Sequence, residues 1–179
     1  MPFKVTYRIF EDGKTAPCQT YTDRRQAVVE FHHLQETKGY LRYRMETEVT
    51  PGDLTSPEKY VWLVYRVLQA IRKYYDERGK VSKEQSDDNL KVSLALEKEL
   101  DDWNTRTRFY LQGHPKSRPD DEKAFAFFQV VEEWRSLWKK YFAYKRSKDK
   151  DPSVEREMKK QCFDYEKEIR KYVNLVIGL

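Results

Sequence analysis

The sequence has few of the residue types that mark secreted, membrane-bound or metal-binding proteins. Only two of its 179 residues are cysteine, Cys18 and Cys162, and two distant thiols do not make a disulfide framework or a zinc cluster. No stretch approaches the roughly 18 uncharged apolar residues of a membrane span. The first ten residues lack the apolar core of a signal peptide. We therefore expect an intracellular protein of the reducing cytoplasm that does not enter a membrane.

Glycine is also scarce, and none of it is available for a phosphate-binding loop. Each glycine lies at a predicted joint or near the C-terminus: Gly13, Gly39, Gly52, Gly79, Gly113 and Gly178. The sequence has no nucleotide-binding glycine motif, no nucleophile elbow and no zinc-ligand spacing. The adjacent His32 and His33 point about 100° apart on a helix, so they do not bind one metal ion together. We expect no cofactor, no metal site and no catalytic residue, and hence a protein that is not an enzyme.

Charged and aromatic side chains are abundant. Charged residues make up 36% of the chain and aromatic residues 15%. Disordered chains lack aromatic residues, so this chain is expected to fold. The formal net charge of +5 at pH 7 is compatible with an acidic partner but too small to indicate nucleic acid by itself.

The first fifty residues show strand patterns around one helix. Residues 3–10 alternate between apolar and polar side chains, which predicts a half-buried strand. The Asp-Gly dipeptide that follows is typical of a hairpin turn, and a returning strand is predicted over residues 18–22. Asp23 is a suitable N-cap for a helix over residues 24–38.

Gly39 is expected to end this helix, and residues 40–49 alternate again, which predicts a third strand with Leu41 facing inward. Residues 1–50 therefore predict a small ββαβ unit. Three short strands leave two open edges, and an open edge invites pairing with another chain. The polar face of the third strand carries our candidate partner-binding residues: Arg42, Arg44, Glu46 and Glu48.

From residue 53 onwards the pattern is helical. The most apolar long segment, residues 56–78, predicts a central helix that begins with Ser56 as N-cap and Pro57 in its first turn. A second helix is predicted over residues 87–111 and a third over residues 120–146. Asp151 and Pro152 are predicted to begin the last helix, and the third helix has apolar residues at heptad spacing: Phe127, Val131, Trp134, Trp138 and Tyr141.

Short polar loops between these segments predict a mostly antiparallel four-helix bundle over residues 53–179. The predicted fold class of the whole chain is therefore α+β. We expect the small ββαβ unit to pack on the four-helix bundle, so that the protein forms one compact domain overall.

A short segment resembles the arm-binding domain of tyrosine recombinases. The resemblance is carried by the Asp12-Gly13-Lys14 turn, Thr22, Ala27 and Phe31. It covers a small part of the chain, and the recombinase catalytic pattern of Arg, His and Tyr does not follow it. The chain is therefore not assigned to that family.

The function that these observations favour is a non-catalytic protein–protein interaction or assembly component. Such a protein is an adaptor, an inhibitor or a structural subunit, and its partner is another protein or a second copy of the chain.

A nucleic-acid-binding accessory protein is the alternative, because aromatic and basic residues interleave near the end of the 120–146 helix. The residues of this basic patch are Arg135, Lys139, Lys140, Tyr144, Lys145, Arg146 and Lys148. The same stretch also has the pattern of a solvated helix end, where cations suit the negative end of the helix dipole.

Overall fold

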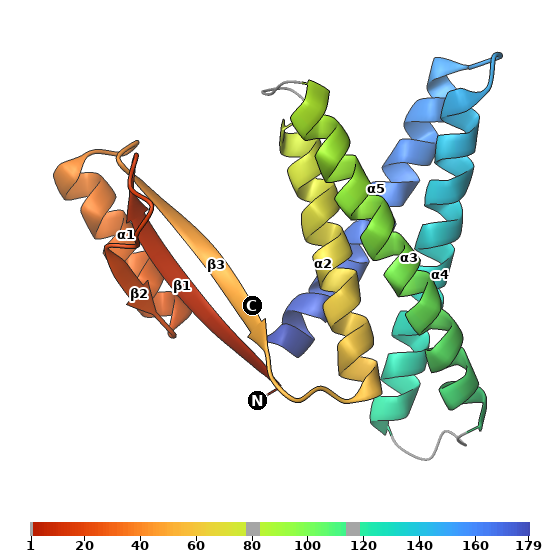
Figure 1. Ribbon diagram of the computed structural model, residues 1–179, viewed down its shortest axis with the longest axis horizontal. Helices are drawn as coiled ribbons and strands as arrows, with labels where there is room; N and C mark the ends of the chain where they lie inside the picture. Colours follow the sequence, from red (N-terminus) through yellow and green to blue (C-terminus); the bar gives the residue numbers. More distant parts are fainter. Residues whose placement is uncertain (1, 78–82, 114–118) are drawn as a thin grey trace. The chain divides into compact units, whose positions relative to one another are not determined.

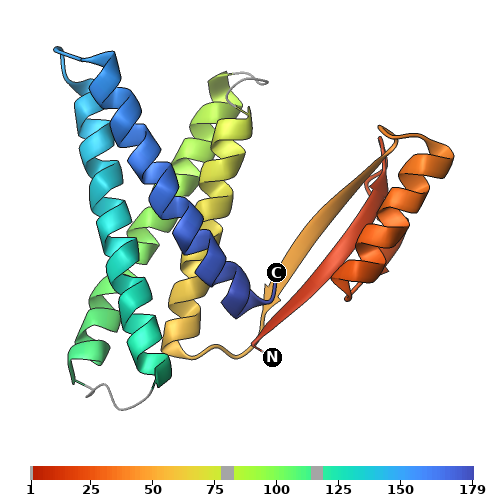
Figure 2. The ribbon, with the colours of Figure 1, turned by 180° about the vertical axis from the view of Figure 1, so that it is seen from behind.

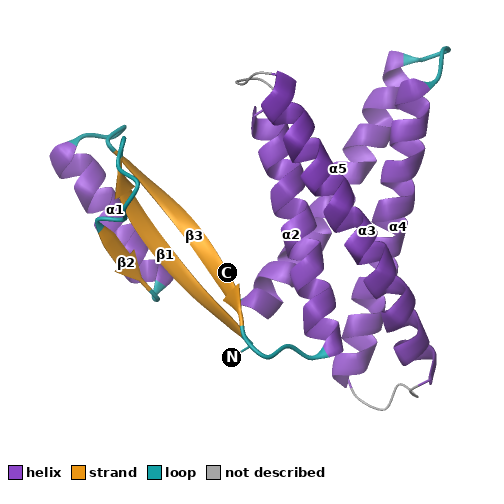
Figure 3. Cartoon of the chain, viewed as in Figure 1, coloured by secondary structure: helices purple, strands orange, loops and turns teal. Residues whose placement is uncertain are grey.

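The computed structural model describes residues 2–77, 83–113 and 119–179. Over these residues the chain is α+β, with five helices and one three-stranded antiparallel sheet. It divides into two compact units, Met1–Leu54 with Ile177–Leu179, and Thr55–Val176. The strands all belong to the first unit (Figure 3). Within the described ranges, no helix is both long and apolar enough to cross a membrane.

The sheet of the first unit is built around β1 (Phe3–Glu11), which lies between β2 (Gln19–Tyr21) and β3 (Tyr43–Pro51) (Figure 1). β3 pairs antiparallel with β1 along its whole length, whereas β2 pairs with only three residues of β1. Helix α1 (Arg24–Lys38) lies on one face of this sheet (Figures 1 and 2). The result is one long ladder with a short third strand and a single covering helix.

The alternation of β1 produces the core that the sequence predicts, with one addition. Phe3, Tyr7 and Ile9 are buried on the face predicted to be apolar. Phe10 belongs to the opposite face, yet its side chain is also buried. The guanidinium of Arg44 lies 4.7 Å from the centre of the Phe10 ring and covers it. A cation on the neighbouring strand therefore shields an aromatic ring that the pattern places on the polar face.

The predicted limits of α1 are confirmed, and so are both of its caps. The Asp23 carboxylate accepts hydrogen bonds from the backbone N–H groups of Arg25 and Gln26, at 2.7 and 3.1 Å. At the other end, Gly39 has a φ of +116° and donates its N–H to the Gln35 carbonyl at 3.1 Å. Glycine adopts this backbone conformation without the steric cost that a side chain would add. Gly39 thus ends the helix where expected.

The predicted start of the third strand is wrong. β3 begins at Tyr43, and the three residues before it form a turn in which the Arg42 N–H donates to the Gly39 carbonyl at 3.2 Å. The Leu41 side chain, predicted to face inward, is 95% exposed, and that of Tyr40 is 69% exposed. The apolar–polar alternation extends through Leu41, but the turn forced at Gly39 takes these residues out of the ladder.

The second unit consists of long helices: α2 (Ser56–Glu77), α3 (Lys83–Gly113), α4 (Pro119–Arg146) and α5, whose full span is Pro152–Ile177. The predicted end of the first of these, Arg78, lies outside the described residues. α3 begins four residues earlier than predicted. Lys, Glu, Gln and Ser occupy this extra turn, and a helix continues through such residues because none is a strong helix breaker.

α4 supplies the aromatic core of the helical unit. All five residues of its predicted heptad stripe are buried, which confirms that prediction. The Tyr60 ring of α2 lies 5.9 Å from that of Phe127 and 5.5 Å from that of Phe128, centre to centre. Phe127 also stacks on Tyr172 of α5 at 4.3 Å. α4 therefore contacts both α2 and α5 through aromatic rings.

Several polar atoms in this core have no hydrogen-bond partner among the described residues. They include the Tyr60 hydroxyl, the Asn104 amide, the Thr107 hydroxyl and the indole N–H of Trp134. Burial raises the pKa of the Tyr60 hydroxyl above its ordinary value, so this group stays neutral. A buried hydroxyl without a partner loses its bonds to water and gains none in exchange.

We predict that Tyr60→Phe raises the free energy of unfolding by about 1 kcal/mol, because it removes a desolvated hydroxyl and keeps the ring contacts. Leu68→Ala is the matched control in the same helix. Leu68 is 1% exposed, so its truncation leaves a cavity and lowers the free energy of unfolding by about 2–5 kcal/mol. Urea denaturation measures both changes. Loss of stability in Tyr60→Phe would mean that the hydroxyl has a partner.

Candidate functional site

The outer side of β3 presents open backbone groups. The Asp12 N–H donates to the Arg42 carbonyl at 2.7 Å, and the Gly52 N–H donates to the Pro2 carbonyl at 2.8 Å. In the antiparallel register these bonds show that the even-numbered residues of β3 direct their N–H and C=O groups towards β1. The odd-numbered residues direct theirs to the other side. No strand in the described part of the chain pairs with that side.

Four odd-numbered residues of β3 carry both an N–H and a C=O on this open side: Tyr43, Met45, Thr47 and Val49. We call their outward backbone groups the β3 edge. Pro51, the next residue of the same parity, has no N–H to offer. A proline at this place is compatible with a strand edge that faces solvent or a partner.

The structure brings the four predicted partner-binding residues together on one face of β3. Arg44 pairs with Glu46 at 2.9 Å, Glu48 pairs with Arg8 of β1, and Arg42 pairs with Glu11 at 3.1 Å. Arg42 immediately precedes the strand and continues the even-numbered series. The four side chains stay between 45% and 61% exposed. Their ion pairs are therefore solvated and leave the charges accessible to another molecule.

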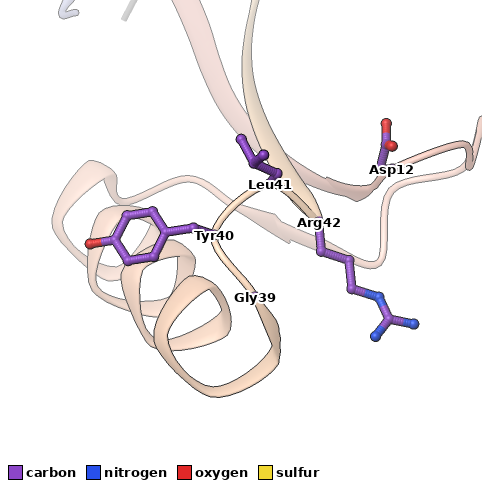
Figure 4. Close-up of a pocket in the computed structure, with 5 residues that line it drawn as sticks. All are labelled: Asp12, Gly39, Tyr40, Leu41 and Arg42. Atoms are coloured by element: carbon purple, nitrogen blue, oxygen red, sulfur yellow. The ribbon is translucent and has the colours of Figure 1, made fainter.

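A shallow hollow of about 500 Å³ lies at the turn before β3 and is lined by Asp12, Gly39, Tyr40, Leu41 and Arg42. In Figure 4 the side chains of Tyr40 and Arg42 point in opposite directions from this turn. The exposed side chains of Tyr40 and Leu41 thus stand directly beside the edge strand. The sequence analysis missed this apolar feature. The signal was available in an apolar pair that directly follows a helix-ending glycine.

The structure places one acidic residue of α3 beside two members of the predicted basic patch of α4. Arg135 is only 12% exposed and pairs with Asp101 of α3, a residue distant in sequence. Lys139 lies 4.0 Å from the same carboxylate and is 71% exposed. The Tyr144 hydroxyl accepts a hydrogen bond from the Asp151 N–H at 2.8 Å and so fastens the loop between α4 and α5.

Two other members of the basic patch, Lys140 and Lys148, are exposed. The side chains of Lys145 and Arg146 lie outside the described residues. Asp101 of α3 offsets part of the charge of the patch from a neighbouring helix, which the sequence of α4 alone does not reveal.

A second ion pair joins α3 to α4. One guanidinium nitrogen of Arg108 donates to both carboxylate oxygens of Glu132, at 2.5 and 2.6 Å. These residues and the Asp101–Arg135 pair line a hollow of about 430 Å³. Burial raises the pKa of Glu97, one helical turn before Asp101. The carboxylates that line this hollow form ion pairs with the cations that line it, so the hollow offers little net charge to a ligand.

The two cysteines occupy different environments. Cys18 is exposed, and its thiol donates to the Ile9 carbonyl at 3.2 Å. Cys162 of α5 is buried, and burial raises the pKa of its thiol to about 11. In the described ranges no three side chains of His, Cys, Asp or Glu are grouped in a way that suits a metal ion.

The β3 edge is the candidate site that the geometry favours, because open backbone groups, exposed charges and exposed apolar side chains coincide there. No family model, curated protein or solved structure matches this chain. The assignment of a function therefore depends on the chemistry of the chain's own residues.

We predict that a maleimide labels Cys18 rapidly in the native protein and labels Cys162 only on unfolding. The thiolate is the reacting species, and Cys162 is both inaccessible and protonated at neutral pH. Mass spectrometry of peptides after native and denatured labelling measures the two rates. Rapid native labelling of Cys162 would contradict the placement of this side chain in the core.

We predict different effects on stability for two charge removals in α4. Arg135→Gln lowers the free energy of unfolding by about 1–3 kcal/mol, because Arg135 is largely buried and its loss removes the closer of the two cations beside Asp101. Lys140→Gln, the exposed control, changes it by less than about 0.5 kcal/mol. Thermal and urea denaturation measure the stability of both variants. Equal effects would show that the Asp101–Arg135 pair contributes nothing.

A double variant, Lys139→Gln with Lys140→Gln, tests the nucleic-acid alternative. We expect the wild type and this variant to elute alike from immobilised single-stranded DNA and RNA, because Asp101 offsets part of the positive charge of the patch. A nucleic-acid site would instead give a salt-dependent affinity whose log–log slope falls by roughly one for each phosphate contact removed. A salt-dependent affinity of the wild type for DNA or RNA, with a smaller slope in the variant, would establish the alternative.

Proposed function

We propose that this chain is a non-catalytic protein–protein interaction or assembly component, and that the β3 edge is its binding site. An adaptor, an inhibitor or a structural subunit would use such a site. The observation that carries the proposal is the nine-residue β3, hydrogen-bonded on one side only within the described residues. Such an edge accepts an extended segment of a partner, which adds as a further strand.

The side chains around the edge support the same mode of binding. Backbone hydrogen bonds to an added strand give affinity without sequence preference, and side chains on either face give selectivity. Here the even-numbered face supplies two cations and two carboxylates, while Tyr40 and Leu41 offer apolar surface at one end. A partner segment with charges in the complementary order would be preferred over one with like charges.

The finer architecture belongs to this proposal. We infer that β1, β2, α1 and β3 act as one ββαβ unit, and that α2 to α5 form a mostly antiparallel four-helix bundle. The contacts of α4 with α2, α3 and α5 support the bundle, as does the bond from Arg170 of α5 to the Leu68 carbonyl of α2 at 3.4 Å. Two free thiols support a role in the reducing cytoplasm.

We predict that Thr47→Pro weakens partner binding while the protein stays folded. The Thr47 N–H points away from β1, so proline removes an outward donor and places its ring against an incoming strand without breaking the β1–β3 ladder. The expected loss of affinity is about tenfold or more. Thr47→Ala, which keeps the N–H, is the matched control and binds like the wild type.

The measurement is affinity capture from the cells of origin with quantitative mass spectrometry, together with circular dichroism of each variant. The proposed site would be wrong if Thr47→Pro captured the same partners as the wild type. It would also be wrong if no protein were enriched by the wild type and Thr47→Ala over Thr47→Pro, and the wild type were monomeric at every concentration.

A further inference from the structure

The charged residues beside and within β3 have an order that is complementary to its own reverse. Two cations, Arg42 and Arg44, are followed at the same two-residue spacing by two carboxylates, Glu46 and Glu48. Met45 is the midpoint of the series. When such a strand is turned end to end, each cation falls on the position of a carboxylate. The side chains that flank the β3 edge are therefore complementary to those of an identical antiparallel strand.

We propose that the β3 edge binds the β3 edge of a second copy of this chain, in the antiparallel register centred on Met45. The proposal deepens the interaction function proposed above and rests on it. In this register Arg44 lies opposite Glu46 of the second copy, and Arg42 lies opposite Glu48. The two-fold symmetry repeats both pairs, so four cation–carboxylate pairs form along one face.

The backbone parity of β3 permits this register. Two copies of Met45, both with outward N–H and C=O groups, lie directly opposite each other and exchange two hydrogen bonds. Tyr43 and Thr47 of opposite copies do the same. The charged residues then occupy the non-hydrogen-bonded pairs, where Cα atoms approach to about 4.5 Å and side chains are closest.

Neighbouring registers place like charges together. Pairing centred on Glu46 sets that carboxylate against itself, and pairing centred on Thr47 sets Glu46 against Glu48. Pairing centred on Arg44 sets two guanidinium groups together. Like charges directly opposite each other destabilise a strand pair. The register centred on Met45 is the one among these four in which each charge meets its opposite.

The ion pairs within each copy do not oppose this association. The Arg44–Glu46 and Arg8–Glu48 pairs are largely solvated, and exposed ion pairs contribute little to stability. A second copy extends them into a network across the new ladder. The interface is small, because it consists of one strand pair and its flanking side chains. We therefore expect a dimer that depends on protein concentration and weakens as salt screens the charges.

A charge-exchange experiment tests the proposal on the full chain by sedimentation velocity over a range of concentrations. Arg44→Glu places two carboxylate pairs in the dimer, and Glu46→Arg places two guanidinium pairs. Each single variant is expected to raise the dimer dissociation constant by about tenfold or more. An equimolar mixture of the two restores opposite charges and regains the dimer. The variant with both changes in one chain also dimerises like the wild type.

A cysteine pair tests the register independently of the charge changes. In a Cys18→Ser background, Met45→Cys brings two thiols opposite each other, with Cα atoms about 5.5 Å apart, which is within disulfide range. Thr47→Cys is the matched control. Its thiols lie four residues apart along the strands, about 13 Å, and do not join. Mild oxidation followed by non-reducing electrophoresis should give a covalent dimer of the first variant alone.

A monomeric wild type at all concentrations, with no Met45→Cys dimer, would overturn this inference. So would a dimer in which both single charge variants associate as tightly as the wild type. Neither result contradicts the proposed function if a different protein is captured by the wild type and by Thr47→Ala but not by Thr47→Pro. The failure of the dimer and the failure of the binding site are therefore distinguishable.

Discussion

The antiparallel pairing of β3 with β1 is the constraint on which the chemistry of the candidate site depends. It assigns every even-numbered backbone group of β3 to an internal bond and every odd-numbered group to the outside. Because side chains alternate with the same period, the same parity gathers the charged residues on one face. A shift of one residue would exchange both assignments at once. The open backbone groups and the charge series are therefore two results of one register.

Local signals in the sequence predict most helices and strands, and they predict where an element ends only when a capping residue marks the end. Asp23 and Gly39 define α1 because capping needs only neighbouring residues. The heptad stripe of α4 is equally local and is confirmed as core. The start of β3 is predicted too early because the apolar–polar alternation continues through the turn after Gly39. In α5 the apolar character of a residue does not predict its burial: Val154 is 42% exposed while Val173 is buried, since the neighbouring helices decide which face of α5 is covered.

Contacts between distant residues are the part that the sequence does not predict. Arg135 belongs to a basic run when read along α4, but Asp101 of α3 pairs with it once the helices pack. Arg44 is read as a surface cation, yet it shields the ring of Phe10 across the ladder. In both cases the relevant neighbour depends on the packing of two elements. The charge of a segment is therefore a poor guide to the charge that a partner meets.

Charges on an edge strand can protect it or select what binds, and their order decides which. A run of one sign repels every identical strand, and charged side chains are one of the means by which proteins prevent edge-to-edge association. The charges beside the β3 edge change sign at Met45, so their effect depends on direction and register. An identical strand in parallel register meets like charges at every position, whereas an antiparallel one centred on Met45 meets opposite charges. The same four residues thus oppose unspecific sheet growth and favour one symmetric pair of strands. This pairing stops at two copies because it uses the open side of each β3.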